Sequence, residues 1–200
     1  MKMPVDLTRQ ACNNILQSMF MLGGFTVFWT VFMFWGFGFG VLPFVVAVVL
    51  IACAVAIFIA ASKMKPVISK AEKRAVDSKD KKASKNWNVI FIIQGTAVGI
   101  VCGVLSFVGA YTYIPAAVAL IVGLHYFPLS ILYHTKIQTV VAIPVVIVSV
   151  LCIVMQAVGM LGVETIGIVS LCVALSTVML GFYMHSLLKS QKILAARHSS

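Results

Sequence analysis

Residues 42–61 have the sequence LPFVVAVVLIACAVAIFIAA, a stretch of 20 residues with no charged side chain. A helix of about 20 apolar residues is long enough to cross the ~30 Å hydrocarbon layer of a bilayer. The many Val and Ile residues would favour a strand in water, but backbone groups in lipid must form their hydrogen bonds within one segment. This stretch therefore predicts a membrane-spanning helix.

Five further stretches have the same character and complete a set of six expected spans. The spans cover residues 15–35, 42–61, 89–109, 114–133, 137–157 and 165–187. The links at 35–43, 110–113 and 158–164 are short, and the glycines and prolines in and beside them favour turns. The expected fold is all-α: a single six-helix transmembrane domain over residues 1–200, built as three hairpins in series.

The composition of the whole chain agrees with this fold. Of the 200 residues, 62% are hydrophobic and 10% are charged, with a mean hydropathy of +1.08. Globular proteins average about 45–50% apolar and about 25% charged residues. This composition excludes a soluble enzyme, a secreted disulfide scaffold and a disordered tail, and it leaves an integral membrane protein.

The distribution of Lys and Arg predicts the orientation in the membrane. Fifteen basic residues oppose five acidic ones, which gives a net charge of +10. The basic residues are Lys2, Arg9, nine residues within 62–86, Lys136, Lys189, Lys192 and Arg197, and none lies in the three short links. Because short cytoplasmic loops retain Lys and Arg, we expect both termini in the cytoplasm and the protein in the inner membrane of a cell.

Residues 62–86 form the basic segment of the chain, the only sizeable part expected outside the bilayer. Pro66 could open a short helix there, and the expected partner of the segment is anionic lipid. Docking of an acidic protein partner is the alternative. Nucleic acid is not expected, because no aromatic residues are interleaved with the basic ones.

Small residues at helical spacing predict where spans pack closely. Such stripes comprise Gly95, Gly99 and Gly103 in span three, Ala52, Ala56 and Ala60 in span two, and Gly167, Ser170, Ala174, Thr177 and Gly181 in span six. Helices in lipid associate through close backbone approach at small residues. We expect these faces to pack inside one bundle, with homo-oligomerisation through one of them as the alternative.

His125 is the clearest ionisable candidate within the spans, where such residues are costly and mark functional sites. At 1.5 Å per residue it lies about 12 Å inside the cytoplasmic end of span four, and Gln94 lies roughly 8 Å inside span three. A candidate polar pocket therefore comprises His125, Gln94, Ser130, Ser176 and Thr177. The alternative is a histidine satisfied by Gln94 or by a backbone carbonyl, which would fix the helix register.

No catalytic, cofactor or metal motif accompanies this pocket. The five cysteines are scattered without a C-x-x-C pair, and no intramembrane carboxylate is available to complete a metal site or an acid–base pair. We therefore expect no enzymatic activity, no cofactor and no bound metal.

The heptapeptide GLHYFPL at 123–129 resembles a signature in the fourth span of small uncharacterised six-helix bacterial membrane proteins. In that family G-x-H is followed by aromatic or aliphatic residues and a proline. The resemblance implies a six-helix inner-membrane protein with His125 and Pro128 at the motif positions, and it implies no activity.

Two functional hypotheses follow from the sequence. In the first, the protein binds or moves a small solute, whose identity the residues do not specify, through the pocket near His125. In the second, it is a non-catalytic structural or regulatory membrane subunit that acts through its basic segment.

Overall fold

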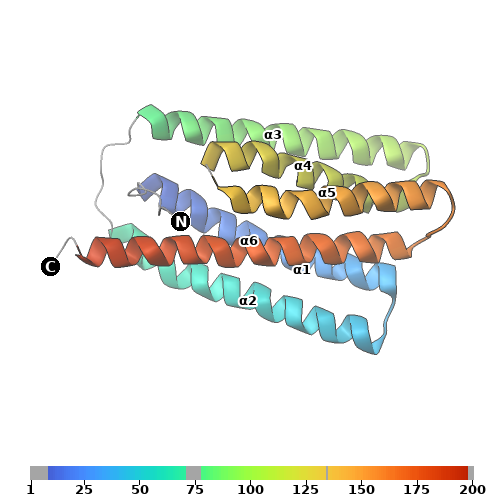
Figure 1. The fold of residues 1–200 in the computed structure, drawn as a ribbon, viewed down its shortest axis with the longest axis horizontal. Coiled ribbons are helices and arrows are strands. Elements are labelled where there is room, and N and C mark those ends of the chain that lie inside the picture. Colours follow the sequence, from blue (N-terminus) through green and yellow to red (C-terminus); the bar gives the residue numbers. More distant parts are fainter. Residues whose placement is uncertain (1–8, 71–77, 134, 198–200) are drawn as a thin grey trace.

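Six long α-helices, with roughly parallel axes, lie side by side in the described part of the computed structural model (Figure 1). The structure describes residues 9–70, 78–133 and 135–197. Within these ranges the elements are α1 (Arg9–Phe37), α2 (Val41–Lys70), α3 (Ser78–Phe107), the 3₁₀ turn η1 (Tyr111–Tyr113), α4 (Ile114–Tyr133), α5 (Lys136–Ala157) and α6 (Glu164–Arg197). The all-α fold is the one predicted from the sequence.

Six stretches of these helices are long and apolar enough to cross a membrane. They cover Cys12–Phe37, Val41–Pro66, Lys85–Phe107, Tyr111–Ile131, Lys136–Ala157 and Glu164–Lys189. Each overlaps one of the expected spans, with ends that differ by a few residues. The prediction of a multi-span membrane protein is confirmed.

Short turns join α1 to α2, α3 to α4 and α5 to α6 at the same end of the bundle (Figure 1). Each turn contains a glycine with a positive φ: Gly38 (72°), Gly109 (75°) and Gly159 (71°). The Gly109 N–H donates to the Ser106 carbonyl, and the Ala110 N–H donates to the Leu105 carbonyl. These two bonds form a Schellman motif, in which glycine adopts the left-handed conformation that ends the helix.

The basic segment differs from its expected structure. Pro66 does not open a separate helix but lies inside α2, which continues to Lys70, and α3 begins at Ser78. Proline has no N–H group, so the Ser62 carbonyl, four residues earlier, has no helical donor. This is tolerated because Ser62 and Pro66 are both exposed. Residues 71–77 lie outside the described ranges. Residues 67–70 and 78–84 of the segment therefore extend α2 and α3 beyond their apolar spans.

Helix α6 is the centre of the bundle, because it packs against α1, α2, α4 and α5. Buried residues fill 61% of its most apolar stretch, whereas the corresponding stretch of α3 has none. In Figure 1, α3 lies at the edge of the bundle, and α4 is the long helix against which it packs most. The core is thus built around α6, and α3 is peripheral.

Small residues bring α1 and α6 close together. A Cβ atom added at Gly36 would collide with the backbone of Ile166 and Gly167, and one added at Gly181 would collide with the Ile57 side chain of α2. The hydroxyl oxygens of Thr26 and Thr177 lie 2.8 Å apart in a buried hydrogen bond between α1 and α6. The small-residue stripe of α6 therefore faces the interior, as expected.

The stripe expected in α2 is wrong in its position around the helix. Ala52 and Ala56 are exposed on the outer surface, and Ala60 is partly buried against the core. The buried face consists instead of Ala47, Leu50, Ala54, Ile57, Ala61 and Met64, at alternating spacings of three and four. Residues of α2 are apolar on every side, so hydropathy did not distinguish its inner face from its outer face.

The glycine stripe of α3 also differs from expectation. Gly95, Gly99 and Gly103 are exposed, and apart from chain neighbours and the adjoining backbone of α3, no described atom lies within 4 Å of a Cβ built on any of them. The expectation that this face packs inside the bundle is therefore wrong. Since apolar side chains and small residues are both compatible with lipid, the sequence pattern did not specify that α3 turns this face outward.

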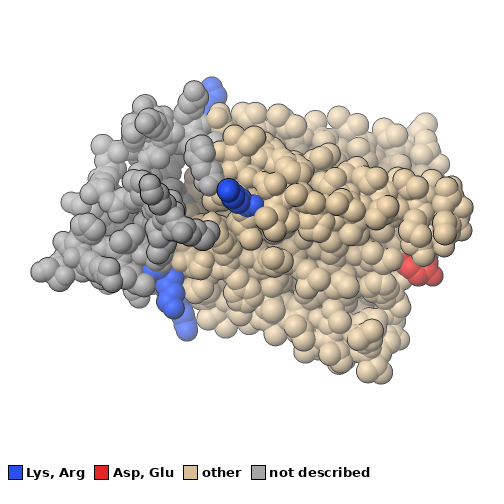
Figure 2. Space-filling model, in the orientation of Figure 1, with Lys and Arg blue, Asp and Glu red and all other residues tan. Residues whose placement is uncertain are grey.

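Charged residues are separated between the two ends of the bundle (Figure 2). The described lysine side chains, Lys63, Lys65, Lys85, Lys136 and Lys189, all lie near the helix ends opposite the three glycine turns. Glu164 begins α6 at the turn end. We call the lysine-bearing end the basic end of the bundle.

Candidate functional site

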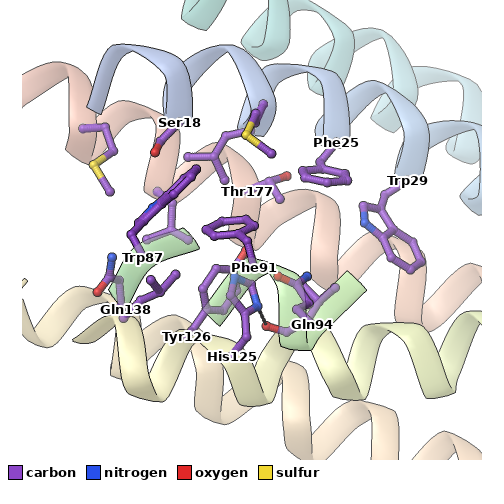
Figure 3. Close-up of a pocket in the computed structure, with 16 residues that line it drawn as sticks. Ser18, Phe25, Trp29, Trp87, Phe91, Gln94, His125, Tyr126, Gln138 and Thr177 are labelled. Atoms are coloured by element: carbon purple, nitrogen blue, oxygen red, sulfur yellow. Dashed lines mark hydrogen bonds between the residues drawn. The ribbon is translucent and has the colours of Figure 1, made fainter. Parts of the chain in front are cut away.

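A partly open cavity of about 70 Å³ lies among α1, α3, α4, α5 and α6, in the half of the bundle nearer the basic end. A cavity needs about 10–15 Å³ of volume to hold one water molecule, so this cavity has room for about five to seven water-sized groups. Its polar lining includes Ser18, Gln94, His125, Gln138 and Thr177 (Figure 3). Aromatic and aliphatic side chains form the rest of its wall.

The aromatic wall is a set of rings in mutual contact. Trp87 and Phe91 of α3 have ring centroids 4.2 Å apart, and Phe91 meets the His125 ring edge-on at 5.6 Å. Phe25 and Trp29 of α1 line the opposite side in Figure 3. Such rings give a rigid, largely apolar surface that suits a flat or hydrophobic ligand.

His125 has one ring nitrogen engaged by its own helix. Its Nδ1 is hydrogen-bonded to the Val122 carbonyl one turn earlier (Figure 3). Because a carbonyl oxygen only accepts, Nδ1 carries the proton, and in the neutral ring Nε2 is left with an unprotonated lone pair. The sequence allowed for a histidine satisfied by a backbone carbonyl, and this holds for Nδ1. Nε2 is available as an acceptor.

Gln94 presents a second acceptor. Its Oε1 atom is buried and has no hydrogen-bond partner among the described residues. An unpaired buried acceptor costs about 1–3 kcal/mol of stability. The side chain lies beside the His125 ring in Figure 3, with no hydrogen bond drawn between them. The cavity therefore contains a polar group whose partner the described chain does not provide.

Thr177 lines the same cavity, but its hydroxyl is already paired. It donates to the Ala174 carbonyl at 2.8 Å and bonds to Thr26 of α1. Thr177 therefore holds α1 against α6 at the back of the cavity.

The other two members of the expected pocket lie elsewhere. Ser130 donates to the Thr135 carbonyl at 2.8 Å and accepts from Thr139 at 2.7 Å, which closes the turn between α4 and α5. Ser176 donates to the Cys172 carbonyl within α6. The structure thus brings together His125, Gln94 and Thr177 but not Ser130 or Ser176.

Sequence reasoning missed the part of the cavity that α1 and α5 contribute. Ser18 and Trp29 come from α1, and Gln138 comes from the first turns of α5. The sequence could have indicated Trp29, because a tryptophan in the middle of a span departs from the usual interfacial position. Trp29 is only 3% exposed and sits in the core between α1 and its neighbours.

The comparisons with known proteins identify no relative. No family model, curated protein or solved structure matches the chain. Within the described ranges, no three His, Cys, Asp or Glu side chains gather where they could hold a metal ion. The cavity is therefore the feature of the described chain that points to a function.

Proposed function

We propose that this multi-span membrane protein binds a small molecule in the cavity around His125 and Gln94. The observation that carries the proposal is the buried Gln94 Oε1 atom, which has no partner within the described chain and belongs to a side chain that lines a cavity with room for a ligand. Concave sites with apolar walls and a few convergent polar groups are typical binding sites. Binding at this depth is also the first step that a transporter requires.

The proposal includes an orientation, with the basic end of the bundle in the cytoplasm. It is supported by the lysines at that end and by the absence of Lys and Arg from the three glycine turns. The cavity would then lie nearer the cytoplasmic face of the inner membrane.

A screen for ligand-induced thermal stabilisation tests the site. Purified protein is heated with a panel of small polar, lipophilic, cationic and anionic compounds, and the unfolding midpoint is recorded. We expect at least one compound to raise the midpoint of the parent protein. We expect no rise for Val122→Phe, which fills the cavity from α4, and an unchanged rise for Ile92→Phe on the exposed face of α3.

Two results would contradict the proposal. One is that no compound of the panel stabilises the parent protein. The other is that the stabilising compounds act equally on Val122→Phe, provided that this variant retains a cooperative unfolding transition.

The alternative, a regulatory subunit that acts through the basic segment, is favoured by the extension of α2 and α3 beyond their apolar spans. Simultaneous replacement of Lys79, Lys81, Lys82 and Lys85 by Gln separates the two hypotheses. It should leave ligand stabilisation intact if the cavity is the working site.

A further inference from the structure

The cavity borders the region that the bilayer would occupy. Phe25 lines it from α1 and is 42% exposed, so the wall on that side reaches the surface of the bundle. Helices α1 and α3 both line the cavity but make little contact with each other, because α3 packs mainly on α4. A molecule dissolved in the apolar layer would thus meet the cavity beside α1 and α3.

Two of the polar atoms in the lining are hydrogen-bond acceptors for which the described chain gives no partner. With Nδ1 of His125 donating to the Val122 carbonyl, Nε2 offers a lone pair, and Gln94 Oε1 offers a carbonyl oxygen. A ligand that bonds to either acceptor must donate. Hydroxyl and N–H groups can do this, whereas ethers and ketones cannot.

The lack of charged side chains among the described lining residues limits which donor group the ligand can carry. None of the described residues that line the cavity is Asp, Glu, Lys or Arg. An ammonium group buried among aromatic rings without a carboxylate would lose its hydration without an ion-pair partner, which is unfavourable. A neutral hydroxyl group meets the same acceptors without this penalty.

The walls and the volume favour a ring as the body of the ligand. Trp29, Trp87 and Phe91 present aromatic surface, and pairs of aromatic rings attract one another beyond their area of contact. A phenol has seven non-hydrogen atoms, which is comparable with the about five to seven water-sized groups that the cavity holds.

We propose that the cavity takes a neutral lipophilic hydroxyl compound with an aromatic body, a phenol, from the bilayer. The ring lies against Trp29, Trp87 and Phe91, and the hydroxyl group donates to Gln94 Oε1. This inference rests on the proposed function, since it specifies the ligand class of the same site.

Quenching of tryptophan fluorescence tests the inference directly, because two of the three tryptophans line the cavity. Trp35, the third, is 64% exposed and is replaced by Phe to remove its signal. The protein is reconstituted into phosphatidylcholine vesicles and titrated with 4-bromophenol, whose bromine quenches tryptophan on contact. The matched probe, 4-bromoanisole, has the same ring but no hydroxyl proton.

We expect saturable quenching by 4-bromophenol and only linear, unsaturable quenching by 4-bromoanisole. In Gln94→Leu the half-saturating concentration of 4-bromophenol should rise about tenfold, the effect of one lost hydrogen bond to a buried acceptor. Gln156→Leu is the matched control, because Gln156 accepts a bond from Thr165 outside the cavity lining. It should leave the titration unchanged.

The outcomes separate this inference from the proposed function. Saturable quenching by both bromine probes with equal affinity, or an unchanged titration in Gln94→Leu, would overturn the phenol assignment while the cavity remained a binding site. Saturable quenching by 4-bromobenzylammonium alone would also overturn it, in favour of a cation. If no probe saturates and the thermal screen is also negative, both the inference and the proposed function fail.

Discussion

Replacing Gly36 by Ala should destabilise the bundle, whereas the same change at Gly99 should not. A Cβ atom at Gly36 would have its three nearest neighbours, all backbone atoms of Ile166 and Gly167, within 2.8 Å. Backbone atoms cannot rotate away as a flexible side chain can, so α1 and α6 would have to separate. At Gly99 no described atom beyond its chain neighbours and the adjoining backbone of α3 lies within 4 Å of the added atom.

The expected magnitude follows from two opposing effects. Overpacking of a tight contact costs about 1–3 kcal/mol. Replacing Gly by Ala inside a helix stabilises it by roughly 0.5–1 kcal/mol, and this gain applies to both variants to a first approximation. In the difference between them the helix effect largely cancels, so Gly36→Ala should be less stable than Gly99→Ala by about 1–3 kcal/mol.

The free energy of unfolding of each variant is measured by titrating mixed micelles with a denaturing detergent and following tryptophan fluorescence. Equal stability of the two variants would refute the close α1–α6 approach. A loss of more than about 1 kcal/mol in Gly99→Ala would instead show that the outward glycine face of α3 is covered, for example by a second copy of the chain. Size and cross-linking in the same detergent would then identify that copy.

Three further predictions concern the interior and the orientation. Thr26→Val and Thr177→Val should be coupled by about 0.6 kcal/mol in a double-mutant cycle of unfolding, because they share one interhelical hydrogen bond. Gln94→Leu should raise the free energy of unfolding of the ligand-free protein by about 1 kcal/mol, since it removes a buried acceptor without a partner; a loss of stability would show that the amide is structural. In a cysteine-free background, a membrane-impermeant thiol reagent added to intact cells should label Met160→Cys and not Asn86→Cys, and the reverse pattern would invert the proposed orientation.

Depth along each helix could be predicted from the sequence, but rotation about its axis could not. A rise of 1.5 Å per residue placed His125 and Gln94 at comparable depth in neighbouring spans, and both line the cavity. Ser130 and Ser176 were assigned by the same argument of depth, yet they bond to Thr135 and Cys172 instead. Depth alone does not determine which helix face a side chain occupies.

The same limit explains the small-residue faces. In water the buried face of a helix is its apolar face, but in lipid both faces are apolar. Ala52 and Ala54 are therefore indistinguishable by hydropathy, although the first is exposed and the second is fully buried.

The sequence by itself determined the number of spans, the three hairpins and the segregation of basic residues to one end, because hydropathy and charge act along the chain and need no partner. Tertiary structure decided that α6 is central, that α3 is peripheral and turns Gly95, Gly99 and Gly103 outward, and that α1 completes the cavity with Phe25 and Trp29. These outcomes depend on shape complementarity between helices, such as the fit of Gly36 against Gly167, which no pattern along a single helix contains.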